Sequence, residues 1–148
     1  MMEHDVVEAY RLLIADVYEL AGESRRSSEA LARRLQQTAA RWHALSVLAD
    51  GPRTVAGAAR RLGLSRQSVQ RVIDDLAVAG QVELRPNPDH ARAPLVVLTP
   101  AGRQTLTALS RCSARDRRTM LTMAGVSAED LNIARAVLSH LVAAVRNP

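Results

Sequence analysis

Residues 54–76 read TVAGAARRLGLSRQSVQRVIDDL, two short apolar patterns at helical spacing that meet at Gly63. A small residue, Ala59, lies four positions before this glycine, and Val69 lies six positions after it. An Ala allows two helices to approach closely, a Gly permits the turn, and a β-branched residue in the second helix packs back against the first. The spacing predicts a helix-turn-helix, although a packed pair of Ala-rich helices without further function has a similar pattern.

The second helix of this pair, predicted from Ser65 to Ala79, carries its polar residues opposite its apolar ones. At about 100° per residue, its apolar face consists of Val69, Val72, Ile73 and Leu76. Arg, Gln and Ser side chains donate to guanine, bridge to adenine or bind phosphate. We therefore expect DNA contacts from the helix caps and the polar face, namely Thr54, Ser65, Arg66, Gln67, Ser68, Gln70 and Arg71.

Two acidic residues, Asp74 and Asp75, follow this polar run. Because carboxylates repel a phosphate backbone, we expect the N-terminal half of the helix to enter a DNA groove and the C-terminal half to leave it, as helix-turn-helix proteins dock. The alternative is a polar helix face that contacts only water.

A β-hairpin is predicted directly after the helix pair. Residues 82–85 and 95–98 are β-prone and flank the connector PNPDHARAP, whose three prolines exclude a helix. A helix-turn-helix followed by a hairpin is a winged helix, and its wing reaches the neighbouring minor groove or the backbone. The expected contacts in the wing are His90 and Arg92, and Asp89 is the expected support that holds Arg92 by an ion pair.

The charge of the chain indicates a polyanionic partner. The formal net charge is +5, all 20 basic residues are Arg, and residues 51–103 contain eight Arg against four acidic residues. The planar donor fork of Arg suits phosphate oxygens and the guanine edge. Double-stranded DNA is therefore the expected partner.

The flanking segments are predicted helices that are more apolar than a monomer of this size needs. The first, one long helix or two, has an apolar stripe of Val6, Tyr10, Leu13, Val17 and Leu20. The last begins at Ser127 and has the stripe Leu131, Ala134, Leu138, Leu141 and Val145. Such a pair of helices is expected to pack against a second copy of the chain.

Together these segments resemble the MarR family of bacterial transcriptional regulators, most closely from Thr38 to Gly102. The resemblance rests on TAARWHALSVLADGP, on AARRLGLSRQSVQRVIDDLAVAGQVELRPNPDHARAPLVVLTPAG and on the flanking helices. It implies a homodimer built from the N- and C-terminal helices, binding to palindromic operators, and release by a small ligand or an oxidant. Family members often carry an Asp-Arg-Arg run in the wing, where this sequence has His90, Ala91 and Arg92.

The predicted fold is thus mainly α with a small β-hairpin wing, a winged helix-turn-helix with dimerisation helices at both ends. The expected regions are an N-terminal dimerisation region at 1–37, a DNA-binding region at 38–99 and C-terminal dimerisation helices at 100–148, which together form one intertwined domain. The family's ligands imply a pocket beside the DNA-binding region at 38–99, which we call the reading unit. Its candidate lining residues are Tyr10, Tyr18, Trp42 and His43, although the alternative that Trp42 simply fills core volume is the plainer one.

Other chemistry finds little support in the sequence. It contains no Gly-rich phosphate loop, nucleophile elbow or paired-carboxylate pattern, so we predict no catalytic residue, no cofactor and no enzymatic activity. The histidines lack the spacing of metal ligands, so no metal site is predicted. The single Cys112 excludes a disulfide within the chain and is interpreted as a small helical residue.

The sequence also lacks the pattern of a membrane protein. The first twenty residues hold Glu and Asp among apolar positions, and no apolar run approaches the roughly 18 residues that a spanning helix needs. A cytoplasmic location is expected. The leading hypothesis is a dimeric, sequence-specific DNA-binding repressor, and the alternative is a winged-helix protein-interaction module that does not bind DNA.

Overall fold

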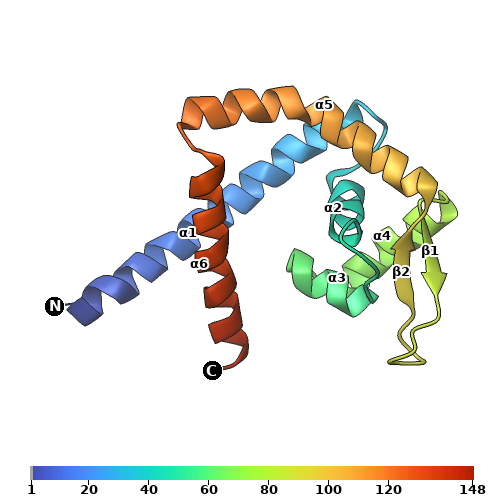
Figure 1. Cartoon of the computed structure of the whole chain (residues 1–148), viewed down its shortest axis with the longest axis horizontal. Helices are drawn as coiled ribbons and strands as arrows, with labels where there is room; N and C mark the ends of the chain where they lie inside the picture. Colours follow the sequence, from blue (N-terminus) through green and yellow to red (C-terminus); the bar gives the residue numbers. More distant parts are fainter. Residues whose placement is uncertain (1) are drawn as a thin grey trace. The chain divides into compact units, whose positions relative to one another are not determined.

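The computed structural model describes residues 2–148, with side chains from residue 5 onward. Figure 1 shows the order of elements, which confirms a mainly helical fold with one hairpin. The elements are α1 (Met2–Arg33), α2 (Ala39–Leu48), α3 (Val55–Leu62), α4 (Arg66–Val78), β1 (Val82–Arg85), β2 (Leu95–Leu98), α5 (Pro100–Ala124) and α6 (Ala128–Arg146). The chain divides into two compact units, Met1–Ser110 and Arg111–Pro148.

The first unit contains the predicted helix-turn-helix. Thr54 Oγ1 accepts a hydrogen bond from Gly57 N at 3.0 Å and caps α3, and Ser65 Oγ accepts one from Ser68 N at 3.1 Å and caps α4. Gly63 lies between the two helices with φ +66° and ψ +31°, a left-handed conformation that residues with a Cβ rarely adopt. The caps and the turn are therefore confirmed where the sequence places them.

A continuous aliphatic core holds the helix-turn-helix together. Ala58 and Ala59 of α3 are buried, which lets α4 approach closely, and Val69 packs back as predicted. The fully buried large side chains of this core come from α2, α4, β2 and α5, and include Leu45, Leu48, Val69, Ile73, Leu76, Val96 and Leu109. Because the chain has no Phe, the core consists of closely packed aliphatic side chains together with Trp42.

The hairpin pairs antiparallel, with Val82 opposite Leu98 and Arg85 opposite Leu95. An isolated bridge adds Arg53 beside Val96, through Arg53 N to Val96 O at 3.2 Å and Val96 N to Arg53 O at 2.7 Å. Arg53 Nε also donates to Val47 O at 3.0 Å. The base of the wing is thereby tied to the segment between α2 and α3, a contact that the sequence does not reveal.

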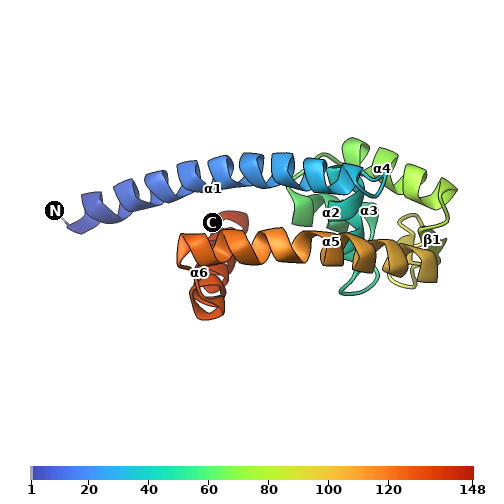
Figure 2. The same cartoon turned by 90° about the horizontal axis from the view of Figure 1, so that it is seen from above.

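The N-terminal segment forms a single helix, α1, which resolves the choice between one helix and two. It runs for 32 residues, and Figure 2 shows that it curves gently. Exposed ion pairs at a spacing of three residues join Arg11 to Glu8 and Arg26 to Glu23. The guanidinium of Arg26 lowers the pKa of Glu23, and that of Arg11 lowers the pKa of Glu8.

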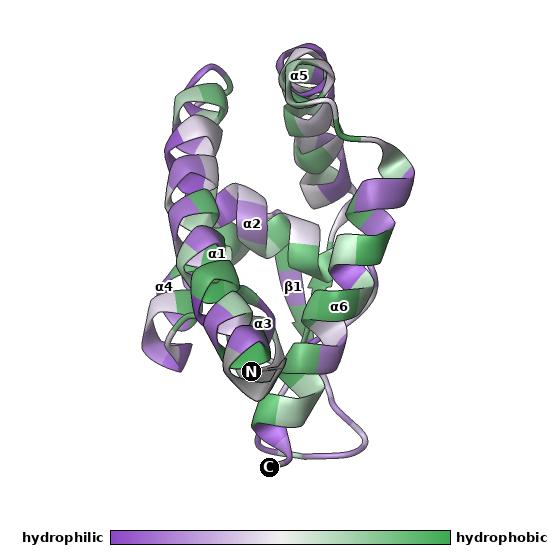
Figure 3. Ribbon diagram, turned by 90° about the vertical axis from the view of Figure 1, so that its left-hand side faces the viewer, coloured by the Kyte–Doolittle hydropathy of each residue, from purple (hydrophilic) through white to green (hydrophobic). Residues whose placement is uncertain are grey.

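The second unit contains the end of α5 and all of α6. Gly125 ends α5 with φ +66°, and Ser127 and Asp130 form a capping box at the start of α6, where the last helix is predicted to begin. The hydrogen bonds from the backbone N–H and hydroxyl of Ser127 lower the pKa of the Asp130 carboxyl. None of the described residues of α6 is buried, although Figure 3 shows apolar residues recurring along it. An exposed helix with this much apolar surface has the character of an interaction surface.

Candidate nucleic-acid interface

The polar face of α4 is exposed, as the sequence predicts. Val69, Ile73 and Leu76 are buried on one side of the helix, whereas Gln67 and Arg71 lie at exposed positions on the other. The residues Arg66, Ser68 and Gln70 flank them and are exposed too. Helical spacing and burial therefore agree on which side chains of α4 are free to meet a partner.

The two serines at the start of α4 bond to each other. Ser65 Oγ donates to Ser68 Oγ at 2.8 Å and accepts from the backbone N–H of Ser68. Thr54 has the same capping role at α3 and is half-buried. These three candidate contact residues thus first hold the ends of the helices, and any contact with DNA comes in addition to this structural role.

The face of α4 that points away from the core continues beyond Arg71. Asp74 follows three positions later and is exposed, and its Oδ1 accepts a hydrogen bond from Gln70 Nε2 at 2.8 Å. Val78 follows four positions after Asp74 and is 92% exposed. The sequence identifies Gln70 as a candidate contact but not its bond to Asp74, because an exposed side-chain pair leaves no hydrophobic pattern.

The wing places His90 and Arg92 at exposed positions of its loop, as expected. The ion pairs found among the described residues do not include one between Asp89 and Arg92, and the supporting role of the Asp89 side chain stays a prediction. Asn87 helps to hold the loop through its Nδ2, which donates to Ala93 O at 2.9 Å. Asn87 Oδ1 also accepts from Asp89 N at 3.1 Å.

The sequence contains a signal for this role of Asn87. An Asn between two prolines, with Asp two positions later, is typical of a turn in which the Asn side chain bonds to the backbone two residues on. The Asn87 side chain thus helps to close the loop that carries His90 and Arg92, together with backbone hydrogen bonds from His90 N to Asn87 O at 3.3 Å and from Ala93 N to His90 O at 3.1 Å.

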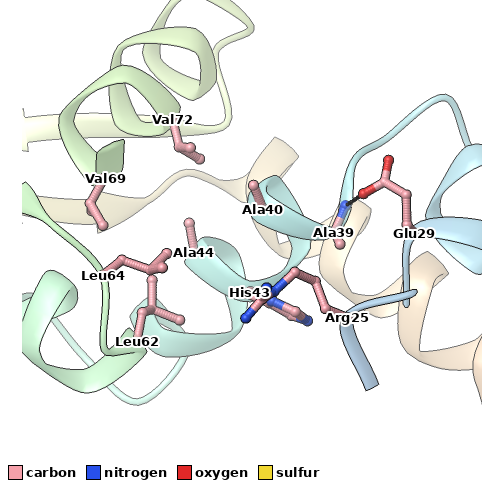
Figure 4. A pocket seen from close by; sticks show the side chains of 10 residues that line it. All are labelled: Arg25, Glu29, Ala39, Ala40, His43, Ala44, Leu62, Leu64, Val69 and Val72. Carbon is pink, nitrogen blue, oxygen red and sulfur yellow. Dashed lines mark hydrogen bonds between the residues drawn. The ribbon is translucent and has the colours of Figure 1, made fainter. Parts of the chain in front are cut away.

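A cavity of about 270 Å³ lies within the first unit, between α1, α2 and the helix-turn-helix. Arg25 and His43 both line it, and Figure 4 shows Glu29 bonded to the backbone N–H of Ala39. The remaining lining is apolar and consists of Ala39, Ala40, Ala44, Leu62, Leu64, Val69 and Val72. The cavity therefore combines a mainly apolar wall with a small number of charged or polar groups, as ligand sites do.

Only one of the four candidate pocket residues lines this cavity. His43 does, whereas Trp42, one position earlier, is buried in the core at 3% exposure, as the alternative interpretation has it. Tyr10 and Tyr18 lie at exposed positions of α1 and do not line this cavity. Arg25 and Glu29 line the cavity from α1, and the sequence did not identify them because neither belongs to a motif.

No group of three or more His, Cys, Asp or Glu side chains gathers within the part of the chain that the structure describes. None of the described helices combines the length and apolar character needed to cross a bilayer.

Comparison with known proteins gives consistent matches. A model of the MarR family matches residues 35–93. An uncharacterized protein of Mycobacterium tuberculosis is 57% identical over 98 residues, which are 66% of this chain and 68% of that protein. Two crystal structures, of the transcriptional regulator BldR from Sulfolobus solfataricus and of a mutant MarR from E. coli complexed with operator DNA, share the fold.

The BldR structure matches with a TM-score of 0.78 at 19% identity, over 90% of this chain and 97% of that one. The MarR structure matches with a TM-score of 0.67 at 21% identity, over 95% of this chain and 98% of that one.

Proposed function

Because the chain belongs to the MarR family, whose members are transcriptional regulators and not enzymes, we propose that it is a homodimeric repressor of a palindromic operator. The observation that carries this proposal is the exposed polar face of α4, which lies beside a wing with an exposed Arg92. In this arrangement α4 enters the major groove, and the wing contacts the neighbouring minor groove or the backbone.

The exposed apolar residues of the outer helices support the homodimer. In α1 they include Val6, Val7, Tyr10, Leu12, Tyr18 and Leu20, and in α6 Leu131, Ile133, Val137, Val142 and Val145. Contiguous apolar surface is seldom left exposed by a monomer. A twofold pairing through these helices would set two α4 helices on successive major grooves, with half-site centres about 10 base pairs apart.

The experiment that tests this function is selection of bound duplexes from a random pool at physiological salt. We expect a palindromic consensus with two half-sites, because a twofold dimer reads the same sequence on both strands. Binding of no duplex, with retention on a protein partner, would favour the interaction module. A consensus without symmetry would contradict the dimer but leave DNA recognition in place.

Arg71→Ala tests the proposed base contact of α4. We expect a loss of about 1 to 3 kcal/mol in operator binding together with relaxed preference at one position of the half-site. The measurement is titration of the selected operator and its single-base variants. The control is Arg118→Ala, which removes an exposed Arg outside the reading unit. A uniform loss across all duplexes would show that Arg71 contacts phosphate.

Arg92→Ala tests the wing. Each phosphate contact releases about one counterion, so the slope of log K against log salt should fall by about one unit. The slope is measured from operator titrations between low and physiological salt, with Arg118→Ala alongside. An unchanged slope would place the wing outside the interface.

We also propose that a small ligand enters the cavity and changes DNA binding. Arg25 and Glu29 of α1 and Leu64, Val69 and Val72 around the start of α4 line the same space. An occupant would thus touch the recognition helix and α1 together, and any difference in its affinity for two positions of α4 shifts the binding equilibrium.

A further inference from the structure

The bond between Gln70 and Asp74 restricts what α4 can read. Gln70 Nε2 donates to Asp74 Oδ1 at 2.8 Å, across one turn of the helix. Such a spacing places two side chains side by side, and a Gln with an Asp at this spacing stabilises a helix by a few tenths of a kcal/mol. Both side chains are exposed, so the pair is accessible to a partner that approaches α4.

The chemistry of the two groups fixes the direction of the Gln70 amide. A carboxylate has no hydrogen to donate, whereas an amide has a donating nitrogen and an accepting oxygen. The amide must therefore turn its NH₂ group toward Asp74, and its Oε1 is directed away from that carboxylate. Without Asp74, both orientations of the amide would be available to a base.

The bases differ at the point where such an oxygen would meet them in the major groove. Adenine and cytosine present an exocyclic amine there, and guanine and thymine present a carbonyl oxygen. An amide that offers Oε1 can accept a hydrogen bond from the first pair of bases. The same oxygen repels the carbonyl oxygen of guanine or thymine, so an amide that presents Oε1 binds the second pair of bases less well.

We propose that Asp74 is a positioning residue, which holds the Gln70 amide so that α4 prefers an amino base, adenine or cytosine, at one position of each half-site. This inference rests on the proposed function, since it requires α4 to enter the major groove. The preference is strengthened on binding because the groove excludes water, and hydrogen bonds gain strength in a less polar environment.

Asp74→Asn is the sharpest test. Asn keeps the shape of the side chain, but its own amide can donate to the Gln70 oxygen or accept from the Gln70 NH₂ group. The wild type should prefer amino to keto bases at one operator position by about five- to tenfold, the effect of one hydrogen bond. In Asp74→Asn this ratio should fall toward one. The measurement is competition titration with operators that carry each of the four bases at every position.

Asp75→Asn is the matched control, because Asp75 is the neighbouring exposed carboxylate and Gln70 bonds to Asp74 instead. It removes the same charge and should raise affinity for all duplexes without changing the ratio. Gln70→Glu placed in the Asp74→Asn background should restore the amino preference, because a carboxylate accepts only. A purely structural role for Asp74 would give no such rescue.

Two results would overturn the inference. One is an Asp74→Asn variant that keeps the full amino preference. The other is a Gln70→Ala variant that keeps this preference, which would show that Asp74 itself contacts the base. Failure of the proposed function gives a different result, because the wild type would then select no duplex sequence at all.

Discussion

A carboxylate on the apolar stripe of α6 is expected to convert the protein to a monomer and to weaken operator binding by about 100- to 10,000-fold. Val145→Asp is the variant, because Val145 lies on the predicted stripe with Leu138 and is 67% exposed in the single chain. Its replacement therefore costs the folded chain little. In a dimer interface, however, it would bury an unpaired charge.

The large loss of binding follows from the linkage of two half-sites. When one reading unit is bound, the second binds at a high effective concentration, and separation of the chains removes this gain. Sedimentation gives the oligomeric state, and titration with the full operator and a single half-site gives the affinities. The variant should bind both duplexes with similar affinity.

The control for this variant is Ala143→Asp. Ala143 is exposed and lies two residues before Val145, on a different face of α6 at about 100° per residue. It places the same charge near the same end of the helix. A dimer in both variants would contradict the proposed interface, and a monomer in both would show that the contact is not confined to the stripe of Val145.

The second large effect is expected at Gly102, in the first turn of α5. A Cβ at this position would lie 2.0 Å from the backbone oxygen of Gln81 and 3.3 Å from Leu98 Cδ2. The close approach is held by Thr99, which donates from its N–H to Gln81 O at 3.1 Å and from Oγ1 to Gly80 O at 2.6 Å. A methyl group at position 102 would therefore push α5 away from the start of the hairpin.

We expect Gly102→Ala to lower the free energy of unfolding by about 3 kcal/mol, the upper part of the range for overpacking. The backbone of Gln81 must move to make room, and no rotation of a side chain can relieve the contact. Chemical denaturation followed by circular dichroism measures the change. Loss of operator binding should accompany it, because the wing begins at the displaced segment.

Gly22→Ala is the matched control within α1. There a Cβ meets only the guanidinium of Arg26, at 3.9 Å. Because Ala is a better helix former than Gly, this variant should gain about 0.5 to 1 kcal/mol. A Gly102→Ala protein as stable as the wild type would show that the contact with Gln81 relaxes at little cost.

The sequence predicts those parts of the fold that depend on neighbouring residues. The caps at Thr54, Ser65 and Ser127 and the turn at Gly63 are confirmed, because each acts on backbone groups within one helical turn. The hairpin follows from two β-prone runs and a connector rich in proline. The assignment of individual DNA contacts and the boundaries of the three regions stay predictions.

The candidate site was predicted less completely than the fold. Opposite charges three positions apart predict an ion pair of Asp89 with Arg92, and Asn87, which bonds to the backbone of the loop, is not among the predicted site residues. Tyr10 and Tyr18 are the pocket residues expected from the first helix, whereas Arg25 and Glu29 are the residues of α1 that line the cavity. Charge and residue type alone did not identify these partners.

The sequence by itself therefore determined the helices, their ends and the polar face of α4, since periodicity and capping are properties of adjacent residues. Only the tertiary structure decided that Arg53 ties the wing to the end of α2, that Gly102 must lack a side chain, and that His43 rather than Trp42 meets the cavity. Each of these depends on the distance and rotation between elements far apart in the chain. Packing of the whole core sets those quantities, and no local pattern encodes them.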